Sequence, residues 1–123
     1  MFAVDGGGSV VGSVIAWYDM RGEERVASLH WLVVEESRQR QGIGRALLRR
    51  AMNFYRTRGE TCVYLHTQPW SWRACLLYAA EGFRWQKRDT FAGYENQFGA
   101  ASETLRNVLP ADAYAVLLAS AEE

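Results

Sequence analysis

The sequence predicts a mixed α/β fold, in which helices flank a sheet that has both parallel and antiparallel neighbours. Apolar, β-branched runs of strand length occupy residues 10–17 and 25–34, and a helical pattern covers residues 42–58. A further apolar strand follows at residues 61–67. Strand, helix and strand in succession imply a parallel pair, whereas short turns between the first runs imply antiparallel neighbours.

The first strands are separated by turn-forming residues. The segment 5–8, Asp-Gly-Gly-Gly, precedes the run 10–17, and residues 2–4 are its expected hairpin partner. A second turn is expected at residues 19–24. It leads into the strand 25–34, whose end is almost continuously apolar, as in a strand covered on both faces.

The central helix is predicted from apolar residues at helical spacing with arginines on the rest of the wheel. The apolar positions are Ile43, Leu47, Ala51, Phe54 and Tyr55. Gly59, directly after Arg58, is expected to end this helix as its C′ residue.

A short helix is expected after the strand 61–67. Pro69 breaks the strand pattern, Ser71 can cap a helix that runs to about Ala80, and Gly82 is its stop signal.

The sequence pattern of residues 83–121 predicts two strands followed by two helices. Residues 83–88 and 91–98 are expected to form a closing pair of strands. Helices are expected over 102–109 and 111–121, because Pro110 suits the first position of a helix. The chain is thus predicted to be one domain, 1–123, with a core over 1–99 and a helical extension over 100–123.

Composition limits the function. With 49% hydrophobic and 23% charged residues, the 123-residue chain is typical of one ordinary soluble domain. No apolar run approaches the roughly 20 residues that span a bilayer, and no signal peptide is recognised, so we expect a cytoplasmic protein that binds no membrane. Cys62 and Cys75 are expected to be free thiols, and together with His30 and His66 they lack metal-site spacing, so no metal is predicted.

A zero net charge argues against nucleic-acid binding, but the positive charge is unevenly distributed. Residues 37–59 contain seven arginines and no acid: Arg38, Arg40, Arg45, Arg49, Arg50, Arg56 and Arg58. This patch is either a solvated helix face or a surface for a polyanion.

The turn Gly42-Ile43-Gly44 lies between the strand and the helix. Unpaired N–H groups at a helix start favour a phosphate, and nearby arginines add charge, so a diphosphate would satisfy both features. Taken alone, the glycines are better explained by a tight strand-to-helix turn. A dinucleotide fingerprint would need a third glycine at the position of Leu47, and no Gly-Lys-Ser/Thr follows for a Walker loop.

Two motifs resemble those of the GNAT acetyltransferases. The first is Gln39-x-x-Gly42-x-Gly44, and the second is the segment 71–83, which is similar to the family's Asn-x-x-Ala-x-x-x-Tyr-x-x-x-Gly-Phe. The resemblance covers roughly residues 10–98. It implies a mostly antiparallel mixed sheet splayed between the family's strands 4 and 5, with acetyl-CoA as cosubstrate.

The resemblance also implies which residues bind the cofactor. Backbone groups of the strand would pair with pantetheine, and the loop and helix start would hold the pyrophosphate. These positions are Leu32, Val34, Gln39, Arg40, Gln41, Gly42, Ile43, Gly44, Arg45 and Ser71. Ser71 replaces the family's asparagine and reaches less far toward pantetheine.

The catalytic residues implied by the resemblance are Tyr78 and His30. Tyr78 occupies the position of the tyrosine that often protonates the departing thiolate; its spacing from Ala74 also fits a core aromatic. His30 is placed on the strand where some relatives carry a basic histidine, and it equally fits a strand residue that packs or meets solvent. Glu35, Glu36 and His66 are weaker candidates for the base.

Other features concern the acceptor and the assembly. Trp70 and Trp72 are candidates for lining an acceptor pocket or for core packing. The family's first strand and two helices have no counterpart in this sequence, and the apolar face of 100–123 must pack somewhere. The chain is then a minimal form, a truncated product or a protein that completes its pocket by dimerising, and the apolar face either substitutes for the missing helices or joins two subunits. Of these, we expect a homodimer, which would also cover the exposed sheet edge.

We therefore expect an N-acetyltransferase that transfers an acetyl group from acetyl-CoA to a primary amine by direct attack in a ternary complex. The acceptor is an unidentified small molecule, protein or peptide. The alternative is a non-catalytic acyl-CoA-binding module or remnant domain that acts through dimerisation.

Overall fold

The structure, a computed structural model, describes all residues 1–123. The chain divides into two compact units, Met1–His66 and Thr67–Glu123, called here the N-terminal and C-terminal units. Each unit is described by itself, and the single domain expected from the sequence stays a prediction. None of the helices combines the length and apolar character needed to cross a bilayer.

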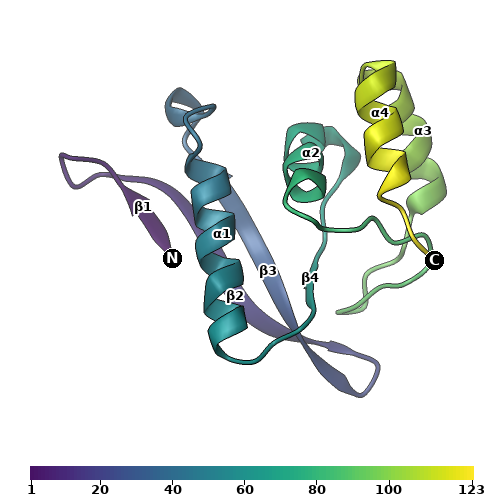
Figure 1. Cartoon of the computed structure of the whole chain (residues 1–123), viewed down its shortest axis with the longest axis horizontal. Helices are drawn as coiled ribbons and strands as arrows, with labels where there is room; N and C mark the ends of the chain where they lie inside the picture. Colours follow the sequence, from purple (N-terminus) through teal and green to yellow (C-terminus); the bar gives the residue numbers. More distant parts are fainter. The chain divides into compact units, whose positions relative to one another are not determined.

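The N-terminal unit is a four-stranded mixed sheet with one helix. Strands β1 (Phe2–Val4), β2 (Val10–Arg21) and β3 (Glu24–Val34) are sequentially antiparallel, and β4 (Val63–Leu65) is parallel to β3. The short 3₁₀ turn η1 (Glu36–Arg38) leads to helix α1 (Ile43–Thr57), which joins β3 to β4 (Figure 1). The predicted mixed α/β fold is confirmed, including the hairpin partner at residues 2–4.

Helix α1 packs on one face of the sheet because its apolar residues recur at helical spacing. Its buried side chains are Leu47, Leu48, Ala51 and Tyr55, whereas Phe54 is partly exposed. The start of the helix lies close to β2 at Gly12, where a Cβ atom would come within 3.1 Å of Leu47 and 3.3 Å of Ile43. Gly59 has φ +80° and follows the C-cap Arg58, as predicted for the C′ residue.

The Tyr55 hydroxyl fastens α1 to the backbone of two strands. It accepts a hydrogen bond from the Trp17 N–H at 2.7 Å and lies 2.8 Å from the Trp17 carbonyl and 2.6 Å from the Ser28 carbonyl. The hydroxyl has one proton, and both carbonyl oxygens lie within hydrogen-bond distance of it. Burial is the largest influence on this phenol and raises its pKa, so that it remains a donor.

The C-terminal unit is helical. It contains η2 (Pro69–Ser71), α2 (Trp72–Ala80), α3 (Phe98–Val108) and α4 (Ala111–Ala119). Its core is formed by Leu105, Leu109 and Leu117, against which Trp72, Cys75, Leu76, Ala79, Trp85 and Tyr114 pack. The apolar face of the C-terminal extension therefore packs on α2, and Pro110 is the N-cap of α4 rather than its first helical residue.

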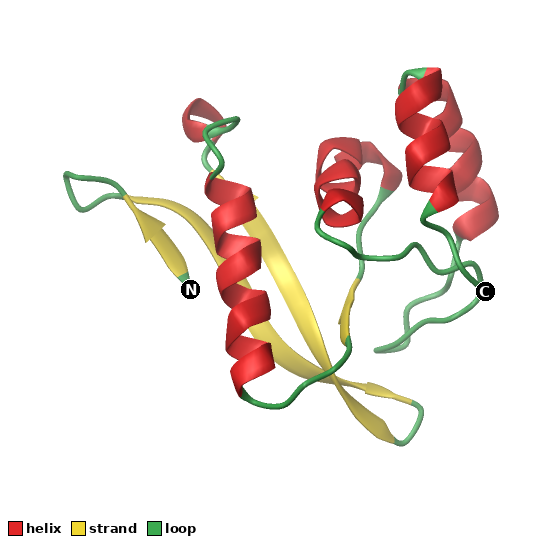
Figure 2. Cartoon of the chain, viewed as in Figure 1, coloured by secondary structure: helices red, strands yellow, loops and turns green.

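The strands expected at residues 83–88 and 91–98 are wrong. Figure 2 shows this part of the chain as a long loop between α2 and α3. Ala92 and Gly93 both have positive φ, which breaks an extended strand, and the Asn96 amide donates to the carbonyls of Gln86 and Asp89. Near the C-terminus, Glu122 takes the place of the expected strand partner, since its backbone bonds to Trp85 and Lys87.

Replacing Tyr55 with phenylalanine should lower the free energy of unfolding by about 1–3 kcal/mol, because three backbone groups lose a buried partner. Urea denaturation followed by circular dichroism measures the change. Tyr18→Phe is the matched control, since the Tyr18 ring packs edge-on against Tyr55 but its hydroxyl forms no hydrogen bond within the chain. Equal losses in both variants would contradict the anchoring role of the Tyr55 hydroxyl.

Candidate active site

The turn that opens α1 exposes unpaired backbone N–H groups. Gly42 is the N-cap residue, with φ 82° and no side-chain cap, and the Ala46 N–H bonds to the Gly42 carbonyl at 3.0 Å. The N–H groups of Ile43 and Gly44 precede this first intrahelical bond and have no acceptor within the helix. Such a helix start attracts an anion through its N–H groups and its dipole.

Two side chains near the predicted phosphate site, those of Gln39 and Arg38, hold the loop that precedes α1. The Gln39 amide donates to the Val34 carbonyl at 3.1 Å, and Arg38 pairs with Asp5 at 3.0 Å. N–H groups of Ser9 and Gly7 act with Arg38 to lower the pKa of Asp5, the Ser9 bond being the largest influence. Arg38 therefore fixes the loop to the β1–β2 turn, whereas the exposed Arg40 forms no ion pair within the chain.

Strand β3 contains a bulge at Trp31. This residue has φ 52°, and the pairing with β2 shifts from Ser13↔Val33 to Ile15↔His30, so β3 carries one extra residue. A left-handed tryptophan costs on the order of 1–3 kcal/mol, and such strain concentrates near functional sites.

Beyond the bulge, one edge of β3 is open within the sheet. Strand β4 pairs only with Ala27–Leu29, so it parts from β3 just before His30. The Glu35 N–H bonds to the Val11 carbonyl on β2. Because backbone directions alternate along a strand, the N–H and C=O groups of Leu32 and Val34 point the other way, to the open edge.

An acid–base cluster lies on the face of the sheet opposite α1. Tyr18 packs against Tyr55 of α1, so its neighbour Asp19 projects from the other face, together with Ser28 and His30 of β3. Asp19 Oδ2 lies 2.6 Å from His30 Nε2 and accepts the Ser28 hydroxyl at 2.6 Å. The Ser28 bond, followed by His30, lowers the pKa of Asp19 and keeps it ionised.

Sequence reasoning missed Asp19 and Ser28. Asp19 was assigned to the turn 19–24, whereas the hairpin continues to the pair Arg21↔Glu24. The signal was the period of two: in a longer hairpin, Asp19, Ser28 and His30 share one face.

Tyr78 lies in α2, within the C-terminal unit. Its ring packs edge-on against Phe83 with centroids 5.9 Å apart, and its hydroxyl forms no hydrogen bond within the chain. Burial is the main influence on this phenol and raises its pKa, so it stays protonated at neutral pH.

The other residues singled out around α2 differ in their surroundings. Ser71 precedes α2 as its N-cap residue, but its hydroxyl makes no cap bond. Trp72 packs on the leucine core, whereas Trp70 is 78% exposed. Cys75 is half-buried, and both cysteines are free, as predicted.

The weaker candidates for the catalytic base lie after the ends of β3 and β4. Glu35 and Glu36 are exposed after β3, and His66 follows β4, where partial burial lowers its pKa. No three His, Cys, Asp or Glu side chains gather in a group that could hold a metal ion.

The profile of the acetyltransferase (GNAT) family matches residues 1–83. The chain belongs to the GNAT family. The match includes the strand, loop and helix start described above and extends through Tyr78 to Phe83.

Solved acetyltransferase structures are similar to this GNAT chain. An acetyltransferase from Trypanosoma brucei shares 26% identity with a TM-score of 0.57 over 69% of this chain and 60% of that one. An aminoglycoside acetyltransferase from an uncultured soil metagenomic sample shares 22% identity with a TM-score of 0.44, over 50% and 41% of the two chains. No curated protein sequence matches the chain. This chain thus spans about 60% of the length of the trypanosomal enzyme.

The acid–base cluster predicts a pH dependence of stability. The pKa of Asp19 in the folded chain lies below its ordinary value of 3.8, so the carboxylate stabilises the fold above about pH 4. As the pH falls through the lowered pKa, this contribution is lost. The difference in unfolding free energy between the wild type and Asp19→Asn should therefore shrink below pH 4, as urea melts at a series of pH values would measure. A difference that stays constant down to pH 2 would contradict the lowered pKa.

Proposed function

We propose that the chain is an N-acetyltransferase that transfers an acetyl group from acetyl-CoA to a primary amine of a small molecule, protein or peptide, by direct attack in a ternary complex. The observation that carries this proposal is the uncapped start of α1 at Gly42, which follows the open edge of β3 at Leu32 and Val34. The helix start can bind a diphosphate, and the strand edge can pair with amide groups. The two lie on one continuous segment, as an elongated cofactor with a diphosphate requires.

The pyrophosphate would be held by the loop and the first turn of α1. The N–H groups of Ile43 and Gly44 have no acceptor in the helix, and Gly42 adopts the left-handed conformation that lets the backbone turn toward a ligand. Exposed Arg40 adds a positive charge. The backbone from Arg40 through Gln41 would complete the cradle, while Gln39 positions the loop through its bond to Val34.

The pantetheine arm would extend β3 as an additional strand. Its amides can pair with the outward-pointing groups of Leu32 and Val34, as peptides do when they add to a sheet edge. The Val34 carbonyl already accepts the Gln39 amide, so the Val34 N–H and the Leu32 groups are the main partners. We also propose, as the family resemblance implies, that Ser71 contacts the pantetheine arm.

Acetyl transfer requires an acid and a base. An amine of pKa ~10.4 is neutral in only about one part in a thousand near pH 7.4, so a base must remove its proton. We assign this role to His30. The amine nitrogen then bonds to the acetyl carbon, the carbon–sulfur bond breaks, and Tyr78 donates its proton to the thiolate. Burial raises the pKa of Tyr78, so the phenol is protonated at neutral pH and has a proton to give.

A homodimer and a cytoplasmic location also stay proposals. The edge strand β1 supports the dimer, since Phe2 and Val4 are 71% and 57% exposed and Val10 beside them is 58% exposed. An apolar sheet edge of this kind favours pairing with a second copy.

Gly44→Glu should abolish acetyl-CoA binding, because it places a side chain and a negative charge in the first turn of α1. Isothermal titration calorimetry measures the affinity. Gly99→Glu is a matched control, because Gly99 is likewise the second residue of a helix, α3, and a Cβ atom there meets nothing within 4 Å. An unchanged affinity in Gly44→Glu would contradict the pyrophosphate site.

Tyr78→Phe should lower kcat by roughly 10²–10⁴ if Tyr78 is the acid, because the thiolate then leaves unprotonated. Steady-state kinetics over a panel of amines measures kcat, and calorimetry should find the affinity for acetyl-CoA nearly unchanged. Tyr114→Phe serves as the control, since that hydroxyl bonds to Ser102 and packs in the helical core. Should Tyr78→Phe keep the wild-type rate, the acid is another group. Tight acetyl-CoA binding without transfer to any amine would favour the non-catalytic binding module instead.

A further inference from the structure

Asp19 of β2 and His30 of β3 meet across the hairpin, and their contact determines which ring nitrogen of His30 is available. The Oδ2···Nε2 distance is 2.6 Å, within the range of a strong charge-assisted hydrogen bond. We propose that Asp19 is a positioning residue that holds His30 in the tautomer with its proton on Nε2, so that Nδ1 is the basic atom that accepts the proton of the acceptor amine. The catalytic part of this proposal rests on the proposed function; the tautomer does not.

The tautomer follows from the hydrogen-bonding capacity of the partners. An ionised carboxylate only accepts, so Nε2 must carry the hydrogen that lies between it and Oδ2. In a neutral imidazole the other nitrogen, Nδ1, then has the free lone pair. Asp19 is ionised at neutral pH, since its pKa is lowered chiefly by the Ser28 hydroxyl and then by His30.

Ser28 supports Asp19 and is not a nucleophile. Its hydroxyl donates to Asp19 Oδ2 at 2.6 Å and lies 3.2 Å from His30 Nε2. A hydrolytic triad needs the serine and the carboxylate on different nitrogens of the histidine, whereas here both lie at Nε2. Ser28 is also fully buried, so its oxygen is withheld from any substrate.

The position of His30 along β3 agrees with this role. It is the first residue after Leu29, where the pairing with β4 ends, and it directly precedes the bulge at Trp31. A pantetheine arm that leaves a diphosphate at Gly42 and runs along Val34 and Leu32 has its thioester end directed toward His30.

The protons balance as follows. The acceptor ammonium first gives one proton to Nδ1, and His30 becomes an imidazolium whose charge the Asp19 carboxylate stabilises. The neutral amine nitrogen bonds to the acetyl carbon, the carbon–sulfur bond breaks, and the thiolate takes a proton from the acid assigned to Tyr78. The acylated nitrogen loses its second proton, which restores the Tyr78 phenol through solvent, and His30 returns its proton to solvent.

Two measurements test the proposal on the full chain. The first is long-range ¹H–¹⁵N NMR of the ¹⁵N-labelled protein, with His66→Gln to assign the two histidines. Neutral His30 should be protonated on Nε2 in the wild type. In Asp19→Asn, the new amide can donate to Nε2, so the proton should shift to Nδ1.

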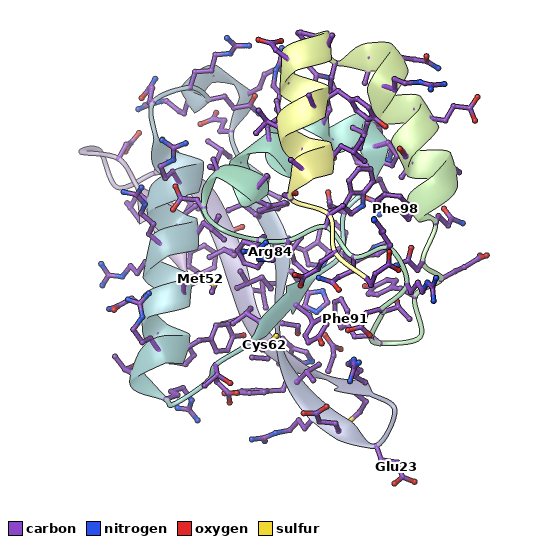
Figure 3. The ribbon with its side chains drawn as sticks, turned by 45° about the vertical axis from the view of Figure 1, so that its right-hand side comes forward. Glu23, Met52, Cys62, Arg84, Phe91 and Phe98 are labelled. Carbon is purple, nitrogen blue, oxygen red and sulfur yellow. The ribbon has the colours of Figure 1, made fainter.

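The second measurement is steady-state kinetics of the same variants. Asp19→Asn should lower kcat at least about tenfold, since the tautomer that accepts the proton is depleted, while the affinity for acetyl-CoA changes less than about twofold. Glu23→Gln is the matched control because it removes a carboxylate from the exposed tip of the same hairpin (Figure 3), and it should leave both kcat and the spectrum unchanged.

The outcomes separate this proposal from the proposed function. A wild-type His30 protonated on Nδ1 would overturn the positioning role without need of any variant. A wild-type rate in Asp19→Asn would also overturn it, whether or not His30→Gln is slow. If the wild type transfers acetyl to no amine, the proposed function fails, and the NMR spectrum alone still decides whether Asp19 sets the tautomer of His30.

Discussion

Much of the N-terminal unit depends on the contact between one buried hydroxyl and two strands. Tyr55 reaches from the last turns of α1 to the backbone of Trp17 and Ser28, while the first turn of α1 lies against Gly12. The helix is therefore fixed at both ends, which fixes its N-terminus relative to β3. Ser28 joins this contact to the acid–base cluster, since its carbonyl faces Tyr55 and its hydroxyl faces Asp19.

Structural features that depend on a local residue pattern could be predicted from the sequence. The helix over 43–57, the left-handed Gly59 and the loop ending at Gly42 all follow from residue types whose preferences act within one or two turns. The family resemblance then gave the functional meaning of the loop. The hairpin was predicted too short, because polar residues such as Asp19 look like turn residues until the pairing partner across the strand is known.

The failure at residues 83–98 has a different origin. Aromatic residues at alternate positions, such as Phe83 and Trp85, favour strands. In the structure, Trp85 packs on the helical core of the C-terminal unit, and the Asn96 side chain bonds to loop carbonyls that a sheet would otherwise pair. The contacts of Trp85 with the leucine core join residues far apart in the sequence, and the Asn96 bonds span ten and seven residues, so the alternation within a single strand could not have indicated them.

The extra residue at Trp31 makes the two halves of β3 depend on one another. Because side chains alternate with a period of two, the bulge decides which face each residue presents on either side of it. A single deletion there would restore a regular ladder, yet it would also turn over one half of the strand. Either His30 would leave the face it shares with Asp19, or the backbone groups of Leu32 and Val34 would turn inward to β2. The length of this strand is thus as tightly constrained as the identity of its residues. At Trp31, a substitution should disturb the protein far less than a deletion.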